Sequence, residues 1–335
     1  MDELLEQIAR WRAAGRPVTL ARAVAVRGMS SEDPFAALTP GEPVAGSVLS
    51  GAADAKLADL IAPHPNSPGR LVEVVVDDAD AVESGLSCGG VAQLLVQPAD
   101  EIPAEAWQLI ADREPVCLIT ALDGGVATTL ATRATVAGAE REHPGVARLF
   151  ARGSTLSALL DEPRTAVTAI WPTTCLVVVG DGLIADALAA NAGLLGWTSV
   201  VVNDAAAAVA AIKALASNDG VVVLSHSRDV DGPALAAALA GRVGYIGALG
   251  ARHTQAARAD WLAGRGVSDL ARVHGPAGLD LGARTPGEIA VAIIAELLAA
   301  RSGRAPASLR DRSGPVHSDG LTAPPPRYPA GGIEP

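Results

Sequence analysis

Cysteines, aromatic residues and long apolar runs are all scarce in this chain. Its 335 residues include three cysteines, whose odd number and wide spacing indicate no disulfide framework: Cys88, Cys117 and Cys175. Such a chain is expected in a reducing cytoplasm. No apolar run approaches the ~20 residues that a membrane-spanning helix needs, so a membrane is not an expected partner.

Positive charge is scarce as well. Lys and Arg total 26 against 37 Asp and Glu, which gives a formal net charge of −11, and no basic run stands out. Such a chain has no general attraction for a phosphate backbone, so nucleic acid is not an expected partner either. The first residues, MDELLEQIARW, have the pattern of an amphipathic acidic helix and not that of a signal peptide.

The length favours two domains, and the two halves of the chain are patterned differently. In the C-terminal half, short apolar runs alternate with helical segments, which indicates an α/β domain with a doubly wound parallel sheet. The predicted strands are 175–179, 199–202, 221–224 and 243–246, and the predicted helices are 184–195, 205–216, 233–239 and 251–263.

The N-terminal half has the pattern of a mixed α+β domain. Asp123-Gly124-Gly125 between two apolar runs predicts a hairpin. Predicted strands are 19–26, 43–48, 72–76, 92–96, 116–121 and 126–131, and predicted helices are 52–61 and 104–111. We place the domain boundary near residues 170–172, which gives domains 1–170 and 171–301; the polar, Pro-rich segment 302–335 is expected to be a flexible tail.

Gly180-Asp181-Gly182-Leu183-Ile184-Ala185 is a G-x-G-x-x-A turn between a predicted strand and a predicted helix, as in a Rossmann domain. Gly180 permits the tight turn, and Gly182 lets a pyrophosphate approach the helix N-terminus. Asp204 ends the next strand, where an acid that binds ribose would lie. Asp181 would repel a phosphate. Nucleotide binding and a turn that binds nothing therefore both remain open.

Two glycine-rich loops in the N-terminal half are further candidates. Ser84 to Gly90 reads SGLSCGG, in which Cys88, Gly89 and Gly90 can present a thiol and backbone N–H groups to an anion. The alternative is a turn with a half-buried thiol. In GSVLSG, Ser50 and Gly51 either face Cys88 or, as composition favours, Ser50 caps the helix that follows.

Loops after the later strands carry charged residues and histidine. Gly250 and Arg252 follow one strand and His226 another, while Asp280 and Arg284 lie in HGPAGLDLGARTPGE. Open α/β sheets bind ligands beyond such strand ends, which favours a site there. Thr285, Pro286 and Glu288 predict a capped helix start that would hold the last loop on a rigid element. The histidines lack metal-ligand spacing, and no G-x-S-x-G, P-loop or CxxC motif is present.

These blocks together resemble the XdhC/CoxI family, the xanthine dehydrogenase accessory proteins. The blocks are GLSCGG, GDGLIA, YIGALGARHT and HGPAGLDLGARTPGEIAVAII, and the likeness extends to about Arg301. The resemblance implies a maturation factor for a molybdenum hydroxylase of the xanthine or carbon monoxide dehydrogenase type. Such a factor binds the molybdenum cofactor, supports its sulfuration with a cysteine desulfurase and passes it to the apo-enzyme, as a cofactor chaperone more than a turnover enzyme.

By the same resemblance, Cys88 would contact the metal of the cofactor and the protein would be a homodimer. Gly180 and Gly182 would mark the nucleotide-type turn, and Arg252, Asp280 and Arg284 would line the crevice. The chain departs from the family pattern at Ala52, where a family cysteine is common, and at Asp181 and Leu183. We further expect the Cys88 thiol and the arginine-lined crevice to share one cavity. Two alternatives stay open, an NAD(P)-dependent oxidoreductase and a catalytically silent docking scaffold.

Overall fold

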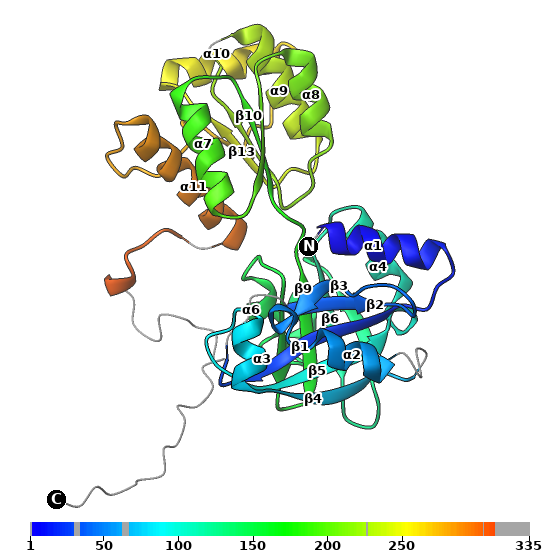
Figure 1. The fold of residues 1–335 in the computed structure, drawn as a ribbon. Helices are drawn as coiled ribbons and strands as arrows, with labels where there is room; N and C mark the ends of the chain where they lie inside the picture. Colours follow the sequence, from blue (N-terminus) through cyan, green and yellow to red (C-terminus); the bar gives the residue numbers. More distant parts are fainter. Residues whose placement is uncertain (1, 30–33, 62–66, 226, 304, 312–335) are drawn as a thin grey trace, which may run out of the picture.

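The structure, a computed structural model, describes residues 2–29, 34–61, 67–225, 227–303 and 305–311. The chain forms an N-terminal part with two antiparallel sheets and a C-terminal part with one parallel sheet (Figure 1). This arrangement confirms the predicted fold class, an α+β domain followed by a doubly wound α/β domain. Within the described segments, every helix is too short or too polar to reach across a lipid bilayer.

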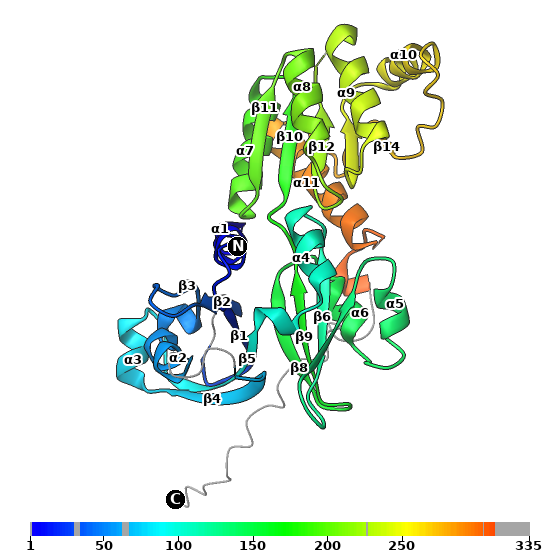
Figure 2. The same ribbon diagram turned by 90° about the vertical axis from the view of Figure 1, so that its right-hand side faces the viewer.

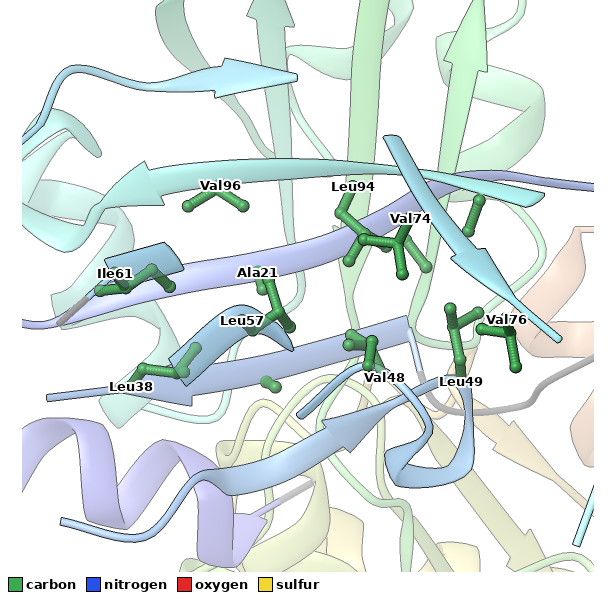
Figure 3. Packing of buried hydrophobic residues seen from close by; sticks show 14 of the residues in the cluster. Ala21, Leu38, Val48, Leu49, Leu57, Ile61, Val74, Val76, Leu94 and Val96 are labelled. Atoms are coloured by element: carbon green, nitrogen blue, oxygen red, sulfur yellow. The ribbon is translucent and has the colours of Figure 1, made fainter. Parts of the chain in front are cut away.

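The first antiparallel sheet has the strand order β3-β2-β1-β5-β4. Its strands are β1 (Thr19–Arg27), β2 (Pro34–Leu38), β3 (Ala45–Val48), β4 (Arg70–Val76) and β5 (Gly90–Pro98). Helices α2 (Asp54–Ile61) and α3 (Asp78–Glu83) cover one face, and an apolar cluster that includes Leu57, Val74 and Leu94 fills the space beneath them (Figure 3). Helix α1 (Asp2–Ala13) packs against β2 and β3.

The second antiparallel sheet has the order β7-β6-β9-β8. Its strands are β6 (Val116–Ala121), β7 (Ala127–Ala131), β8 (Leu156–Leu160) and β9 (Thr165–Ile170). The predicted hairpin is confirmed, because β6 and β7 pair antiparallel. Helices α5 (Val136–Ala139) and α6 (Val146–Phe150) pack on its outer face, and α4 (Ala104–Ala111) adjoins β6.

The two antiparallel sheets pack face to face, with helices outside each of them (Figure 2). Their interface contains a fully buried arginine. Arg22 donates to Gln97 and, at 3.4 Å, to Thr168 Oγ1, while burial lowers the pKa of Arg22 to about 10. Gln97 in turn donates to Thr128 Oγ1 at 2.9 Å. Hydroxyl and amide groups, rather than a carboxylate, therefore solvate this buried charge.

The parallel sheet has the order β11-β10-β12-β13-β14. Its strands are β10 (Cys175–Val179), β11 (Thr198–Val202), β12 (Gly220–Val223), β13 (Tyr245–Ala248) and β14 (Val273–His274). One face is covered by α7 (Leu183–Leu194) and α11 (Pro286–Ser302), and the other by α8 (Ala205–Lys213), α9 (Arg228–Ala240) and α10 (Arg252–Ala263). The apolar β-branched strands are buried on both faces, as such a sheet requires, except at the edge strand β11.

Two differences from the sequence expectations have clear causes. Helix α9 begins at Arg228, five residues before the predicted start at Pro233, because this proline lies inside the helix instead of opening it. Strands β2, β8 and β9 were not predicted; all three contain alanine among their apolar residues, which weakens the strand pattern. Of the predicted tail, the structure describes 302–303 and 305–311, and the rest lies outside the described residues.

The two parts of the chain meet at the amino ends of the parallel strands. Asp219, just before β12, is buried and forms an ion pair with Arg113 of the N-terminal part at 3.2 Å. Arg242 and Ser217 bond to Glu114 at 2.7 and 2.6 Å. We refer to this contact region as the domain joint. The carboxyl ends of the parallel strands consequently lie at the far end of the sheet (Figure 1).

Candidate functional site

The topology of the parallel sheet points to a crevice at the carboxyl ends of β10 and β12. The chain runs from β10 outward to β11 and then returns to β12 on the other side of β10. The β10–β11 and β12–β13 connections therefore leave in opposite directions, which is the topology that places a ligand crevice at this edge in open α/β sheets. Ligands of open α/β sheets bind at such a switch point.

The G-x-G turn lies at this switch point. Gly180 has φ of 124°, and a Cβ there would approach the Ser225 backbone nitrogen to 2.8 Å, so only glycine fits beside the neighbouring loop. Gly182 has φ of 92°, and a Cβ added to it would meet nothing within 4 Å; it precedes α7 without a side-chain cap. The first turn of α7 thus directs backbone N–H groups toward open space, as an anion site requires.

Acidic side chains surround the same turn. Asp181 accepts a hydrogen bond from Asn203 at 3.0 Å, which ties the turn to the end of β11. Asp204 is the N-cap of α8 and accepts from the Ala207 backbone at 2.9 Å. Asp204 thus lies just beyond the end of β11, as expected, with one oxygen engaged in the cap, and its contact with a ribose stays a prediction. The negative charge of Asp181 opposes a phosphate at this turn.

A buried ion pair holds the next two loops. Arg258 of α10 pairs with Asp231 of α9 at 2.7 Å and donates to the carbonyl oxygens of Ser225 and Leu249 at 3.1 and 2.6 Å. Gln255 donates to the carbonyl of Gly250 at 3.1 Å. These residues fix the ends of β12 and β13, yet the sequence analysis missed them. The only local signal is an arginine on the inward face of a helix, which spacing alone does not distinguish from a surface residue.

The loop 275–284 is also fixed by hydrogen bonds, here to side chains of α11. Glu296 of α11 accepts from the Gly278 backbone at 2.8 Å and from the Tyr245 hydroxyl at 2.6 Å, and lies 3.4 Å from His274 Nδ1. This carboxylate and burial raise the pKa of Tyr245, burial being the larger cause. Glu296 was also missed, because its partners are 18 to 51 residues away in the sequence.

The predicted helix start after this loop is confirmed. Thr285 Oγ1 accepts from the Glu288 backbone at 3.3 Å, and the Glu288 carboxylate accepts from the Thr285 and Arg284 backbones at 2.9 and 2.8 Å. These hydrogen bonds lower the pKa of Glu288. The capping box therefore fixes the end of the loop to α11, a helix whose inner face is buried in the core.

The charged residues of the crevice rim are exposed. Arg252 opens α10, and Asp280 and Arg284 lie in the loop before α11. Among the side chains that the structure describes, none forms an ion pair with these three. They are thus available to a ligand, unlike the Arg258 and Glu296 side chains beneath them. His226 lies outside the described residues.

The predicted thiol lies in the N-terminal part. Cys88 is exposed, and its Sγ donates to the Gly28 carbonyl at 2.6 Å. The Gly89 backbone N–H, which the first alternative would direct at an anion, donates to the Asp78 carboxylate at 2.9 Å. Gly89 and Gly90 have no room for a Cβ, because backbone atoms lie 2.5 and 2.2 Å from that position. Gly89 and Gly90 therefore allow their own loop to pack closely against the ends of β4 and β1.

The second glycine-rich loop lies at the same end of the first sheet. Strand β3 ends at Val48, opposite Pro34, and Gly90 pairs with the end of β4, so both loops leave this end. The side chains of Leu49 and Val76 belong to the same cluster there (Figure 3). The predicted cap by Ser50 is wrong: α2 starts only at Asp54, and Ser50 has φ of 54° in a turn between two other residues with positive φ, Leu49 and Gly51.

Within one chain, the structure does not bring the thiol and the arginine rim together. Cys88 belongs to the N-terminal part, while Arg252 and Arg284 follow the carboxyl ends of parallel strands whose amino ends form the domain joint (Figures 1 and 2). The strands themselves separate the two. The expected common cavity is therefore absent from the described part of a single chain. No group of three or more potential metal-ligating side chains occurs there either.

These features define a two-domain protein, with an antiparallel β-sandwich joined to a Rossmann-like domain whose candidate site lies beyond its strand ends. Residues 176–297 match the sequence profile of the XdhC Rossmann domain. The C-terminal domain is thus similar to the XdhC Rossmann domain, which agrees with the resemblance noted in the sequence.

Two similar proteins accompany this match. YqeB of Escherichia coli (strain K12), described as uncharacterized, is 29% identical over 165 residues, which cover 43% of this chain and 30% of that protein. The chain thus spans less than a third of the length of this relative. A solved structure described as a xanthine dehydrogenase from Bacillus halodurans is 19% identical and covers 91% of this chain and 97% of its own, with a TM-score of 0.46.

Proposed function

We propose that this protein is an accessory factor that takes part in xanthine dehydrogenase maturation, binding the molybdenum cofactor and supporting its sulfuration and its insertion into the apo-enzyme. The cofactor is cargo in this proposal and not a resident group. A cysteine desulfurase would be the sulfur donor, and a cytoplasmic location would fit both partners.

The observation that carries the proposal is that Arg252 and Arg284, in loops beyond β13 and β14 of the XdhC-like domain, are exposed and have no ion-pair partner among the described side chains. Two guanidinium groups can form charge-assisted hydrogen bonds to the phosphate of a pterin cofactor. The loop that carries Arg284 is rigid, because Glu296 and the capping box hold both of its ends. Such a rim is preorganised, so that little conformational entropy is lost on binding.

Cys88 takes part in this proposal only if a second subunit supplies it. A thiolate suits the soft metal of the cofactor, but the thiol and the rim are in different parts of one chain. Edge strand β11 offers a surface for such a subunit: Val200 and Val201 are 40% and 44% exposed, and no charged residue lies between Thr198 and Val202. An uncharged edge lacks the usual protection against strand pairing, so we propose a homodimer through β11.

The experiment is co-purification of pterin. The protein is expressed in cells that synthesise the molybdenum cofactor, and the released pterin is oxidised and measured by fluorescence. We expect bound pterin in the wild type, a loss of about tenfold or more in Arg284→Gln, and a similar loss in Cys88→Ala.

The matched control is Lys213→Gln, which removes the same charge at the exposed end of α8. It should retain full binding. Equal pterin in Arg284→Gln and in the wild type would contradict the rim as the binding site. Absence of pterin in every variant, together with capture of the hydroxylase, would favour the docking scaffold instead.

A nicotinamide-dependent oxidoreductase is a second candidate, favoured by the uncapped start of α7 at Gly182 and by Asp204. The carboxylate of Asp181 disfavours it. Calorimetric titration with NAD and NADP separates the two candidates. Saturable heat that disappears in Gly182→Val would support the oxidoreductase, and no heat at millimolar ligand would argue against it.

A further inference from the structure

A small cavity lies in the domain joint, at the opposite end of the parallel strands from the crevice. Its volume is about 80 Å³, and its walls come from both domains. Arg133 follows β7 in the N-terminal domain, and Arg301 lies in the last turn of α11. Ser217, Asn218 and Asp219 form the wall at the start of β12.

The two arginines face the cavity without an acidic partner. Each guanidinium lies over a tryptophan ring: the Cζ atom of Arg133 is 4.7 Å from the ring centroid of Trp171, and that of Arg301 is 5.3 Å from the ring centroid of Trp197. Arg301 also donates a hydrogen bond to Thr174 Oγ1 at 3.0 Å. In the described segments, neither guanidinium has a carboxylate within ion-pairing distance. Each has further N–H donors, because a guanidinium carries five.

The two charges are close enough to oppose one another. Burial lowers the pKa of Arg301, and the positive charge of Arg133 lowers it further. Burial also lowers the pKa of Arg133, which Glu114 partly offsets. The two cations repel one another; because Arg133 is exposed, water screens part of this repulsion, and an anion between them would lower it further.

The carboxylates of the joint are already paired with other arginines. Glu114 bonds to Arg242 at 2.7 Å, and Asp219 bonds to Arg113 at 3.2 Å and to the Cys175 and Ala216 backbones at 2.8 Å each. Neither carboxylate therefore forms an ion pair with Arg133 or Arg301, although the charge of Glu114 partly offsets that of Arg133. This surplus of positive charge stands out in a chain whose formal net charge is −11.

We propose that this cavity is a binding site for one small tetrahedral oxyanion of the phosphate type, clamped between Arg133 and Arg301. A water molecule occupies about 30 Å³ in the liquid, so the cavity has room for two or three waters or for a single phosphate group. A phosphate supplies several acceptor oxygens, and the fork of a guanidinium donates to two of them at once. The anion would bridge the two domains and strengthen their contact. This site is separate from the cofactor crevice and does not depend on the proposed function.

The test is titration of the purified full-length protein with inorganic phosphate, at ionic strength held constant with chloride. Calorimetry should detect one saturable site, and the midpoint of thermal unfolding should rise with phosphate. Arg133→Gln and Arg301→Gln should each weaken phosphate binding about tenfold or more and abolish the thermal shift. Without phosphate, Arg133→Gln should unfold at the wild-type temperature or above it, because it removes the repulsion.

The matched control is Arg141→Gln, which removes one charge from an exposed position in the same domain. It should bind phosphate like the wild type. An equal thermal response to phosphate in the wild type and in Arg133→Gln would overturn the proposal, since it would indicate a general effect of salt. A response without saturation in the wild type would overturn it as well.

Discussion

The Asp219 carboxylate lies 3.2 Å from the Arg113 guanidinium. The two residues are 106 positions apart in the sequence and link the two domains. Only 1% of the Asp219 side chain is exposed, against 35% for Arg113. Two backbone N–H groups, of Cys175 and Ala216, also donate to this carboxylate. The ion pair thus connects the N-terminal domain directly to the first turn before a central strand.

Arg113→Met is expected to destabilise the protein by about 1–3 kcal/mol, because it leaves a buried carboxylate without its counter-charge. The two backbone hydrogen bonds keep the loss below that of a fully unpaired buried acid. Urea unfolding measures the free energy. Arg141→Met, at an exposed position outside the joint, is the control and should change stability by less than ~0.5 kcal/mol. An equal loss in both variants would contradict the role of the pair.

Thr285→Ala should lower stability by about 1 kcal/mol, as expected when a helix loses its N-cap side chain. The same cap makes a pH-dependent contribution through Glu288, whose folded pKa is lower than the ordinary value of 4.5. This contribution is complete above that ordinary value and is lost as the pH falls through the lowered pKa. The difference in stability between wild type and Glu288→Gln should therefore be constant from pH 7 to 5.5 and shrink in more acidic solution. Thermal unfolding across this range checks it; a difference that grows on acidification would be the opposite result.

The three thiols should differ strongly in reactivity. Cys88 is exposed, whereas burial raises the pKa of Cys117 to about 12 and also raises that of Cys175. A disulfide reagent added to the native protein at pH 8 should modify one thiol rapidly, and Cys88→Ala should remove this fast phase. All three should react after denaturation. A fast phase that survives in Cys88→Ala would place the accessible thiol elsewhere.

Two glycines of the same turn should tolerate alanine to different degrees. Both have positive φ, but a Cβ at Gly180 would lie 2.8 Å from the Ser225 nitrogen, and one at Gly182 meets nothing within 4 Å. Gly182→Ala should cost about 1 kcal/mol from backbone strain alone. Gly180→Ala should cost more, by about 1–3 kcal/mol, because neighbouring backbone must move. Chemical denaturation gives both values, and equal costs would be inconsistent with the close packing of the two loops.

The β11 edge provides a test of the proposed dimer. Val201→Lys places a charge in the middle of an exposed strand, which should prevent pairing with a second copy. Light scattering after size-exclusion chromatography should change from a dimer mass to a monomer mass. Lys213→Gln, on α8, is the control and should stay dimeric. A wild-type protein that is monomeric at micromolar concentration would exclude the proposed interface.

Features set by local sequence were predicted well. Strand β10, helix α4 and strand β6 have the predicted bounds, and the capping box at Thr285 and Glu288 is formed as its spacing indicates. In each case the signal lies within a few neighbouring residues, in apolar runs, proline or capping side chains. Short-range preferences suffice to place such elements.

Features set by distant contacts were not predicted. Arg258 and Glu296 support the crevice loops through partners that are 9 to 51 residues away, and no spacing rule reveals such pairs. The end of the parallel sheet that meets the N-terminal domain is also a long-range property. The expected shared cavity for Cys88 and Arg284 failed for this reason, since the sequence indicated both loops but not the direction of the strands between them.

Strand β10 has one end at the domain joint, beside Asp219, and the other at Gly180 in the G-x-G turn. Its five residues rise about 3.3 Å each, a length of about 16 Å, and both of its edges are hydrogen-bonded to neighbouring strands. Both ends of this strand are therefore fixed by hydrogen bonds, so the residues that join the two domains and the residues of the G-x-G turn are carried by one continuous, fully paired strand.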